Sequence, residues 1–289
     1  MRAARLPDGA LPRGFRPIRT SADGRAVTGA EVGSGPPLLL LHGLGGTWAY
    51  WAPAMALLAG SARCIALDLP GFGRSDAPRG GFTLDSAAAG LAGAMDALGA
   101  GPAAVCGHSL GGPLAVRLGL THPEAASRLI LVGPSGLKPA PAWQSRALTL
   151  MPAYRLLRRA PVPWEHWLLG IPPLRRAALR TLVDDPRTVS LEMARTIVDG
   201  GREARELQRA VTASFATGLA EDAREVAAPI AAIWGDRDRM VPPDDAEVLL
   251  RAVPSATLDL LPACGHLPMV ERPHAFAALL ARLAAGERG

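Results

Sequence analysis

Hydrophobic and polar positions along the chain follow two alternating patterns, short unbroken apolar runs and longer segments with apolar residues at helical spacing. The apolar runs predict strands buried on both faces, at residues 37–41, 62–67, 103–106, 129–132, 230–234 and 256–261. The amphipathic segments predict helices at residues 48–58, 83–98, 110–120, 244–253 and 273–284. Strand and helix in alternation indicate an α/β fold with a mostly parallel central sheet and helices on both faces.

Two parts of the chain depart from that alternation. Residues 15–20 and 25–32 read as two strands joined by a turn at residues 22–24, which predicts a hairpin. Between residues 134 and 226, prolines separate helical segments and no strand pattern is present. We therefore expect an α/β core at residues 1–133 and 227–289, with a helical cap, or lid, inserted at residues 134–226 over the active edge of the sheet.

Composition narrows the class of protein. The 289 residues are 49% hydrophobic and 20% charged, and no apolar run approaches the roughly 18 residues needed to span a bilayer. The formal net charge is +5, with Lys138 as the only lysine. No nucleic-acid-binding motif, dinucleotide fingerprint or phosphate loop is present, so we expect no nucleic-acid partner and no cofactor. Three isolated cysteines and an N-terminal segment without a signal-peptide core favour a cytoplasmic location.

One segment carries a nucleophile signature. Residues 107–111 read Gly-His-Ser-Leu-Gly, directly between a buried strand and a predicted helix. This context places Ser109 on a sharp strand-to-helix turn, where its hydroxyl projects from the sheet edge toward the N-terminus of the helix. The two glycines suit a turn in which side chains would clash.

Two later segments supply the groups that a serine nucleophile needs. His266 lies in a loop after the last strand, where it would serve as a general base. Asp236 and Asp238 follow the strand before it, and either carboxylate would orient the imidazole. A further loop, His42-Gly43-Leu44-Gly45-Gly46, follows a buried strand. The backbone amides of Leu44 and Leu110 are candidates for an oxyanion hole.

These motifs together resemble the α/β-hydrolase superfamily, in its group of capped esterases, haloperoxidase-like proteins and meta-cleavage-hydrolase-like proteins. The resemblance spans about residues 25–285 and includes the Asp68-Leu69-Pro70-Gly71-Phe72-Gly73 segment. It implies that Ser109 is the nucleophile, His266 the base and Asp238 the acid, with Asp236 as the alternative. Serine at the turn argues against epoxide hydrolases and haloalkane dehalogenases, which need a carboxylate nucleophile.

Several residues near these motifs are candidates for the substrate pocket. They are His42, Gly43, Phe72, His108, Trp143 and Leu267. His42 and His108 also fit a scaffold role as hydrogen-bonded histidines, and Phe72 fits either a pocket wall or a structural turn. Because the other histidines have no ligand-like partners in the sequence, we expect no bound metal.

The sequence supports a serine hydrolase that cleaves a small to medium, largely apolar carboxylic ester, lactone or thioester through an acyl-enzyme. Carbon–carbon bond hydrolysis, perhydrolysis, and a non-catalytic ligand-binding role remain open as alternatives. Residues 135–180 contain eight basic residues and one acid. Three explanations would each account for these basic residues. They are solvated arginines on an amphipathic cap, recruitment of an anionic or acyl-chain-bearing substrate, and contact with acidic lipid. Membrane contact is not the expected outcome, and the expected state is a monomer or homodimer.

Overall fold

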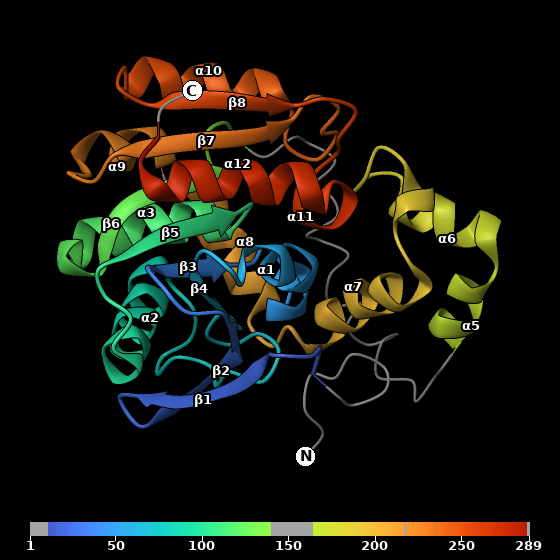
Figure 1. The fold of residues 1–289 in the computed structure, drawn as a ribbon, viewed down its shortest axis with the longest axis horizontal. Coiled ribbons are helices and arrows are strands. Elements are labelled where there is room, and N and C mark those ends of the chain that lie inside the picture. Colours follow the sequence, from blue (N-terminus) through green and yellow to red (C-terminus); the bar gives the residue numbers. More distant parts are fainter. Residues whose placement is uncertain (1–10, 140–163, 217, 288–289) are drawn as a thin grey trace.

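A central eight-stranded sheet organises residues 11–139, 164–216 and 218–287, the parts of the chain that the computed structural model describes (Figure 1). Its strand order is β1-β2-β4-β3-β5-β6-β7-β8. Strand β2 pairs antiparallel with both β1 and β4, and every other neighbouring pair is parallel. The strands are β1 (Arg16–Ala22), β2 (Arg25–Val32), β3 (Pro37–Leu41), β4 (Arg63–Leu67), β5 (Ala103–His108), β6 (Ala126–Val132), β7 (Ile230–Gly235) and β8 (Thr257–Leu261).

Helices cover both faces of this sheet. On one face α1 (Ala52–Leu58) contacts α12 (Pro273–Ala285), beside the short α11 (Pro268–Glu271). On the other face α2 (Leu84–Leu98), α3 (Gly111–Thr121), α9 (Leu219–Glu225) and α10 (Ala246–Ala252) form a continuous layer. The predicted α/β architecture with a mostly parallel sheet is therefore confirmed.

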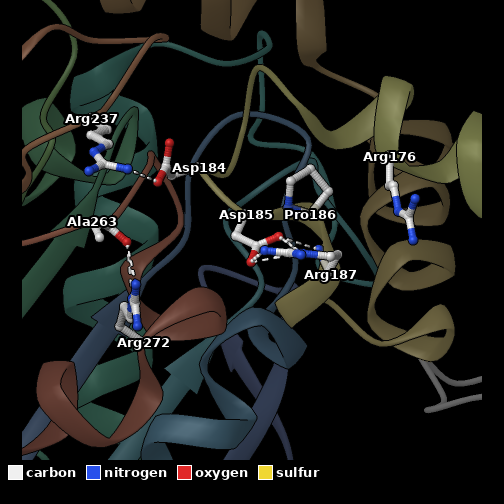
Figure 2. Close-up of a pocket in the computed structure, with 8 residues that line it drawn as sticks. All are labelled: Arg176, Asp184, Asp185, Pro186, Arg187, Arg237, Ala263 and Arg272. Atoms are coloured by element: carbon white, nitrogen blue, oxygen red, sulfur yellow. Dashed lines mark hydrogen bonds and ion pairs between the residues drawn. The ribbon is translucent and has the colours of Figure 1, made fainter.

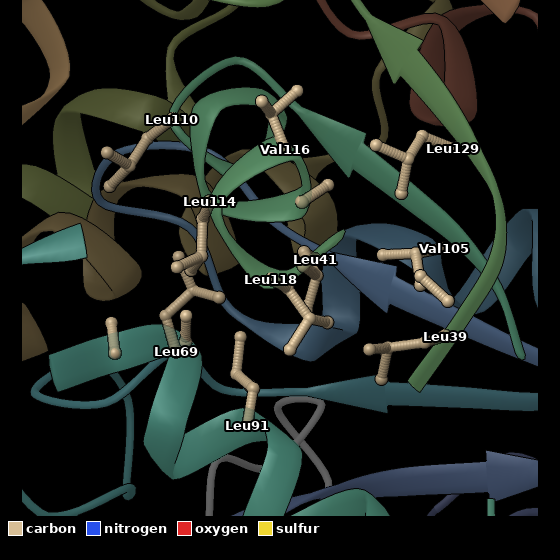
Figure 3. Packing of buried hydrophobic residues seen from close by; sticks show 14 of the residues in the cluster. Leu39, Leu41, Leu69, Leu91, Val105, Leu110, Leu114, Val116, Leu118 and Leu129 are labelled. Carbon is tan, nitrogen blue, oxygen red and sulfur yellow. The ribbon is translucent and has the colours of Figure 1, made fainter. Parts of the chain in front are cut away.

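The alternation of side chains along the strands produces two hydrophobic layers. In β3, Leu39 and Leu41 pack into the cluster beneath α2 and α3, whereas Leu38 and Leu40 pack into the cluster beneath α1 and α12. Figure 3 shows the first cluster, in which leucines from the strands meet leucines from the helices. All four β3 leucines are buried, and each contributes roughly 1.5–3 kcal/mol relative to exposure. The buried strands thus fix the sheet edge from which the site is built.

The expected insertion lies between β6 and β7. Its described residues form only helices and turns, namely α5 (Trp164–Gly170), α6 (Pro172–Leu179), α7 (Leu191–Glu203), α8 (Leu207–Ala216) and α9. In Figure 1, α5, α6 and α7 lie at one end of the molecule, beyond the strands. No helix in residues 11–139, 164–216 and 218–287 is both long and apolar enough to cross a membrane. The use of this insertion as a cap stays a prediction.

Candidate active site

Ser109 lies in the tight turn between β5 and α3. Its backbone is in the left-handed region, with φ of 52°, which is uncommon for a residue other than glycine. Three backbone hydrogen bonds hold this conformation. The Ser109 N–H donates to the carbonyl of Val132 at 3.0 Å, and the Ser109 carbonyl accepts from the amides of Gly112 (2.9 Å) and Ser135 (3.2 Å). Such a backbone costs on the order of 1–3 kcal/mol and persists where its surroundings determine it.

The glycines of the motif make this turn sterically feasible. A Cβ atom on Gly107 would lie 2.1 Å from the carbonyl oxygen of Gly111. A Cβ atom on Gly111 would lie 2.3 Å from the carbonyl oxygen of Leu41. Both distances are far below van der Waals contact, so only glycine fits at these two positions. The spacing read from the sequence thus has a steric cause.

His266 and Asp238 form a buried pair. The distance between His266 Nδ1 and Asp238 Oδ2 is 2.7 Å, and the second carboxylate oxygen accepts the amides of Met240 (2.8 Å) and Val241 (2.9 Å). Because a carboxylate accepts at Nδ1, that nitrogen carries a hydrogen, and in the neutral imidazole the lone pair is then on Nε2. Asp236 instead accepts the amide of Cys264 at 3.2 Å. The geometry therefore pairs the imidazole with Asp238 and not with Asp236.

The histidine loop lies against the serine turn through His108, the neighbour of Ser109. The His108 and His266 rings have centroids 4.6 Å apart, and His108 Nε2–H donates to the His266 carbonyl at 2.8 Å. Gly133 follows β6, and a Cβ there would lie 3.2 Å from Asp238 Oδ2 and 3.5 Å from His266 Nδ1. The segments that follow β5, β6, β7 and β8 thus meet at the carboxyl edge of the sheet, where ligands bind in open α/β folds.

The loop after β3 borders the same serine. A Cβ on Gly43 would lie 2.9 Å from the Cβ of Ser109, so the two backbones approach closely. Among the described residues, the amides of Leu44 and Leu110 have no hydrogen-bond acceptor. Leu110 is the N-cap residue directly before α3, at a helix end where backbone amides are unsatisfied by the helix itself. The role of these two N–H groups as an oxyanion hole stays a prediction.

His42 and His108 are buried, neutral histidines that make hydrogen bonds to the backbone. His42 Nε2 accepts the amide of Leu69 at 3.0 Å, so its Nδ1–H donates to the Gly43 carbonyl at 2.8 Å. Burial lowers the pKa of His42 to about 4 and lowers that of His108 well below its usual value. These contacts connect the loops around Ser109, which matches the scaffold alternative.

The other pocket candidates have different environments. The ring of Phe72 is fully buried between His42 and Phe82, at centroid distances of 5.8 and 5.9 Å, so it packs in the core. Leu267 is likewise buried, at 2% exposure, in the cluster beneath α1 and α12. Trp143 lies outside the described residues, so its pocket role stays a prediction.

Sequence reasoning missed the buried carboxyl group of Glu271. One of its oxygens accepts the Gly265 amide at 2.7 Å, and the other accepts the Asp185 amide at 2.6 Å. Its side chain therefore joins the histidine loop to the inserted region. The available signal was an acidic residue five positions after His266, at the end of the apolar segment Leu-Pro-Met-Val.

A cleft of about 470 Å³ opens beside this junction. Its walls come from the inserted region, the loop after β7 and the loop after β8 (Figure 2). Arg237 donates to Asp184 at 2.9 Å, Arg272 donates to the Ala263 carbonyl at 2.8 Å, and Asp185 pairs with Arg187. Most of the polar groups in this cleft are thus engaged with each other.

The basic half of the expected cap is described only in part. Arg146, Arg155, Arg158 and Arg159 lie outside the described residues. Lys138 pairs with Asp245 at 2.7 Å, and the Arg175 side chain reaches the carbonyl of Leu169. The charge of Lys138 is thus balanced by an acid of the core, whereas the hydrogen bond of Arg175 to a neutral carbonyl leaves its positive charge in place.

Comparison with known proteins places the chain in a family. The family model described as alpha/beta hydrolase fold matches residues 36–273, so the chain belongs to this family. The chain is 32% identical over 263 residues to a 2-hydroxy-6-oxononadienedioate/2-hydroxy-6-oxononatrienedioate hydrolase of Burkholderia vietnamiensis, covering 85% of this chain and 86% of that protein. It is 30% identical over 259 residues to a 2-hydroxymuconate semialdehyde hydrolase of a Pseudomonas species, covering 86% and 87%.

A solved structure extends the likeness. A membrane phospholipase A, described as a bacterial virulence factor, superposes with a TM-score of 0.75 at 24% identity, covering 94% of this chain and 86% of that chain. At that identity the likeness establishes the fold alone. Family membership and the hydrolases among its relatives support a hydrolase acting on a small molecule.

Proposed function

We propose that this protein is a serine hydrolase in which Ser109, His266 and Asp238 form a catalytic triad. Its substrate is a small to medium, largely apolar carboxylic ester, lactone or thioester. The observation that carries the proposal is the buried His266–Asp238 pair beside a serine on a left-handed turn. That combination provides an oriented base and an accessible nucleophile.

The proposed reaction has two acyl-transfer steps. Ser109 Oγ attacks the carbonyl carbon while its proton passes to Nε2 of His266, and the amides of Leu44 and Leu110 hold the oxyanion. Collapse of the tetrahedral intermediate breaks the bond to the leaving group, which takes the proton from His266. A water molecule, deprotonated by the same imidazole, then attacks the acyl-enzyme and releases the acid and Ser109. Asp238 stabilises the imidazolium throughout.

The direct test is substitution of the nucleophile. We expect Ser109→Ala to reduce turnover of short p-nitrophenyl esters by roughly 10⁶-fold, the scale seen when a triad serine is removed. Wild-type protein should also form a covalent adduct at Ser109 with a fluorophosphonate, as detected by peptide mass spectrometry. Ser61→Ala is the matched control, because Ser61 donates to the Leu58 carbonyl in a turn outside the site. Full activity of Ser109→Ala would contradict the proposal.

A second candidate is hydrolysis of a carbon–carbon bond in a dienoic ketone by the same triad. It is favoured by the identities of 30% to a 2-hydroxymuconate semialdehyde hydrolase and 32% to a 2-hydroxy-6-oxononadienedioate/2-hydroxy-6-oxononatrienedioate hydrolase. The two reactions differ in substrate and share the serine, so Ser109 labelling does not separate them. Rates on a matched panel of p-nitrophenyl esters, lactones, thioesters and a 2-hydroxy-6-oxo-dienoate would do so. Preferential turnover of the dienoate would replace the ester proposal.

A further inference from the structure

We infer that Glu271 is a positioning residue that fixes the loop of His266 against residues 182–185 of the inserted region. This inference rests on the proposed function, because it assigns His266 as the base. Glu271 ends the short helix α11, five residues after His266, and only 4% of it is exposed. A carboxyl group in such a position loses its hydration, and its charge must be stabilised by the protein.

Two backbone amides provide that stabilisation. The Glu271 carboxylate accepts from Gly265 N–H at 2.7 Å and from Asp185 N–H at 2.6 Å. Within the described part of the chain, no basic side chain forms an ion pair with Glu271. Its charge is therefore directed to these two amides, and hydrogen bonds to an ionised acceptor are about twice as strong as neutral ones.

The backbone of His266 is held on its other sides as well. Its N–H donates to the Leu182 carbonyl at 2.8 Å, and its carbonyl accepts from His108 at 2.8 Å. A Cβ atom on Gly265 would lie 2.6 Å from the backbone nitrogen of Asp184, the residue before Asp185. The inserted segment thus packs against the histidine loop without space for a side chain. Glu271 is the one side chain in this junction that bonds to both segments, among the residues described.

The charge of Glu271 matters as well as its shape. Glutamine has nearly the same size, but its amide carries one accepting oxygen and one donating nitrogen. With Gln at this position, one of the two backbone N–H groups would face another donor. The histidine loop or the inserted segment must then move. A displacement of about 1 Å at a catalytic group costs on the order of 10²-fold in rate.

The test is Glu271→Gln, compared with Glu247→Gln as the control. Glu247 is an exposed acid that pairs with Arg251 on α10. Kinetics use p-nitrophenyl esters, with the concentration of active sites determined by fluorophosphonate titration. We expect kcat per titrated site and the rate of fluorophosphonate labelling to fall 10- to 100-fold in Glu271→Gln, while KM changes less than threefold. Glu247→Gln should match the wild type in all three measurements.

A second variant separates positioning from folding. Glu271→Asp keeps the charge but is one methylene shorter, so it should reach one of the two amides and retain an intermediate kcat. If Glu271 only stabilised the fold, its variants would show fewer titratable sites with an unchanged kcat per site, and that result would overturn the inference. Equal kcat in wild type, Glu271→Gln and Glu271→Asp would do the same.

Failure of the proposed function gives a different result. Wild-type protein that neither labels at Ser109 nor turns over any ester or dienoate would refute the triad, whatever Glu271 does. Hydrogen exchange then tests the junction by itself. We expect faster exchange in peptides covering residues 182–185 and 263–267 of Glu271→Gln, and unchanged exchange there would refute the contact between the two segments.

Discussion

Single side chains around Ser109 divide into those with reactive chemistry and those that hold loops together. His42 and Asp68 belong to the second group. His42 bonds to the backbone on both sides of its ring. Asp68 accepts the amides of Trp48 and Arg74 and the hydroxyl of Thr28, and burial raises its pKa to about 6. The Asp68 segment, noted in the sequence for its resemblance, thus serves the packing of the loops.

The buried state of His42 predicts a pH dependence of stability. Its pKa is lowered from 6.5 to about 4 by burial. As the pH falls from 6.5 to about 4, the unfolded chain binds a proton at this residue before the folded chain does, so the free energy of unfolding decreases. His42→Asn removes this contribution. We therefore expect the slope of the free energy of unfolding against pH to decrease by up to about 1.4 kcal/mol per pH unit. Urea unfolding at pH values from 4 to 7 measures it.

Comparison of the two slopes separates His42 from Asp68. The pKa of Asp68 is raised, so its contribution to stability has the opposite sign and is lost as the pH rises through about 6. Asp68 is present in both proteins, so its contribution is the same in each, whereas His42 itself helps to lower the pKa of His108, so the difference between the two slopes reports His42 together with its effect on His108. Identical slopes for wild type and His42→Asn would show that His42 titrates normally in the folded protein.

At the scale of elements, the sheet edge is built from strands whose ends are fixed by close backbone contact. The turn between β5 and α3 needs glycine at both flanks because carbonyl oxygens occupy the space of a side chain. Local sequence signals were sufficient to predict these elements, with boundary shifts of a few residues. The predicted helix at residues 48–58 is a 3-10 turn, Trp48–Trp51, followed by α1.

Glycine at position 107 is the sharpest test at this scale. We expect Gly107→Ala to lower the free energy of unfolding by about 2–3 kcal/mol, because its Cβ would lie 2.1 Å from the Gly111 carbonyl. It should also abolish labelling of Ser109. Gly60→Ala is the control, since a Cβ there meets nothing within 4 Å, and it should stay within about 1 kcal/mol of wild type. Thermal and urea unfolding of both variants provide the measurement.

At the scale of the whole molecule, the inserted region and the α/β core meet at the loops that carry His266 and Asp238. Besides Glu271, the junction contains Asp184, which pairs with Arg237 at 2.9 Å and with Arg239 at 3.2 Å. Both arginines come from the loop of Asp238, so this loop and the His266 loop contact the same inserted segment. Movement of that inserted segment would therefore affect both His266 and Asp238.

We expect Asp184→Asn to weaken this junction without unfolding the core. The two arginines are more than half exposed, so solvent screens their pairs with Asp184. The substitution should therefore lower the stability of the junction by no more than about 1 kcal/mol at low salt. Added salt should reduce the difference from wild type. Hydrogen exchange in residues 180–188 measures it, with Glu247→Gln as control. Hydrogen exchange equal to that of the wild type at low salt would indicate that the two ion pairs do not stabilise the junction.

The sequence alone determined the order of strands and helices along the chain and the chemistry available at the sheet edge. These features depend on local patterns, namely apolar runs, helical spacing and glycine beside Ser109. The contact between His266 and Asp238, the core position of Phe72 and the contacts of Glu271 are seen only in the tertiary structure, although the family resemblance already implies Asp238 rather than Asp236. Each depends on contacts between segments distant along the chain. Residues 185 and 271 have no local signal that connects them, because only folding brings that amide and that carboxylate within hydrogen-bonding distance.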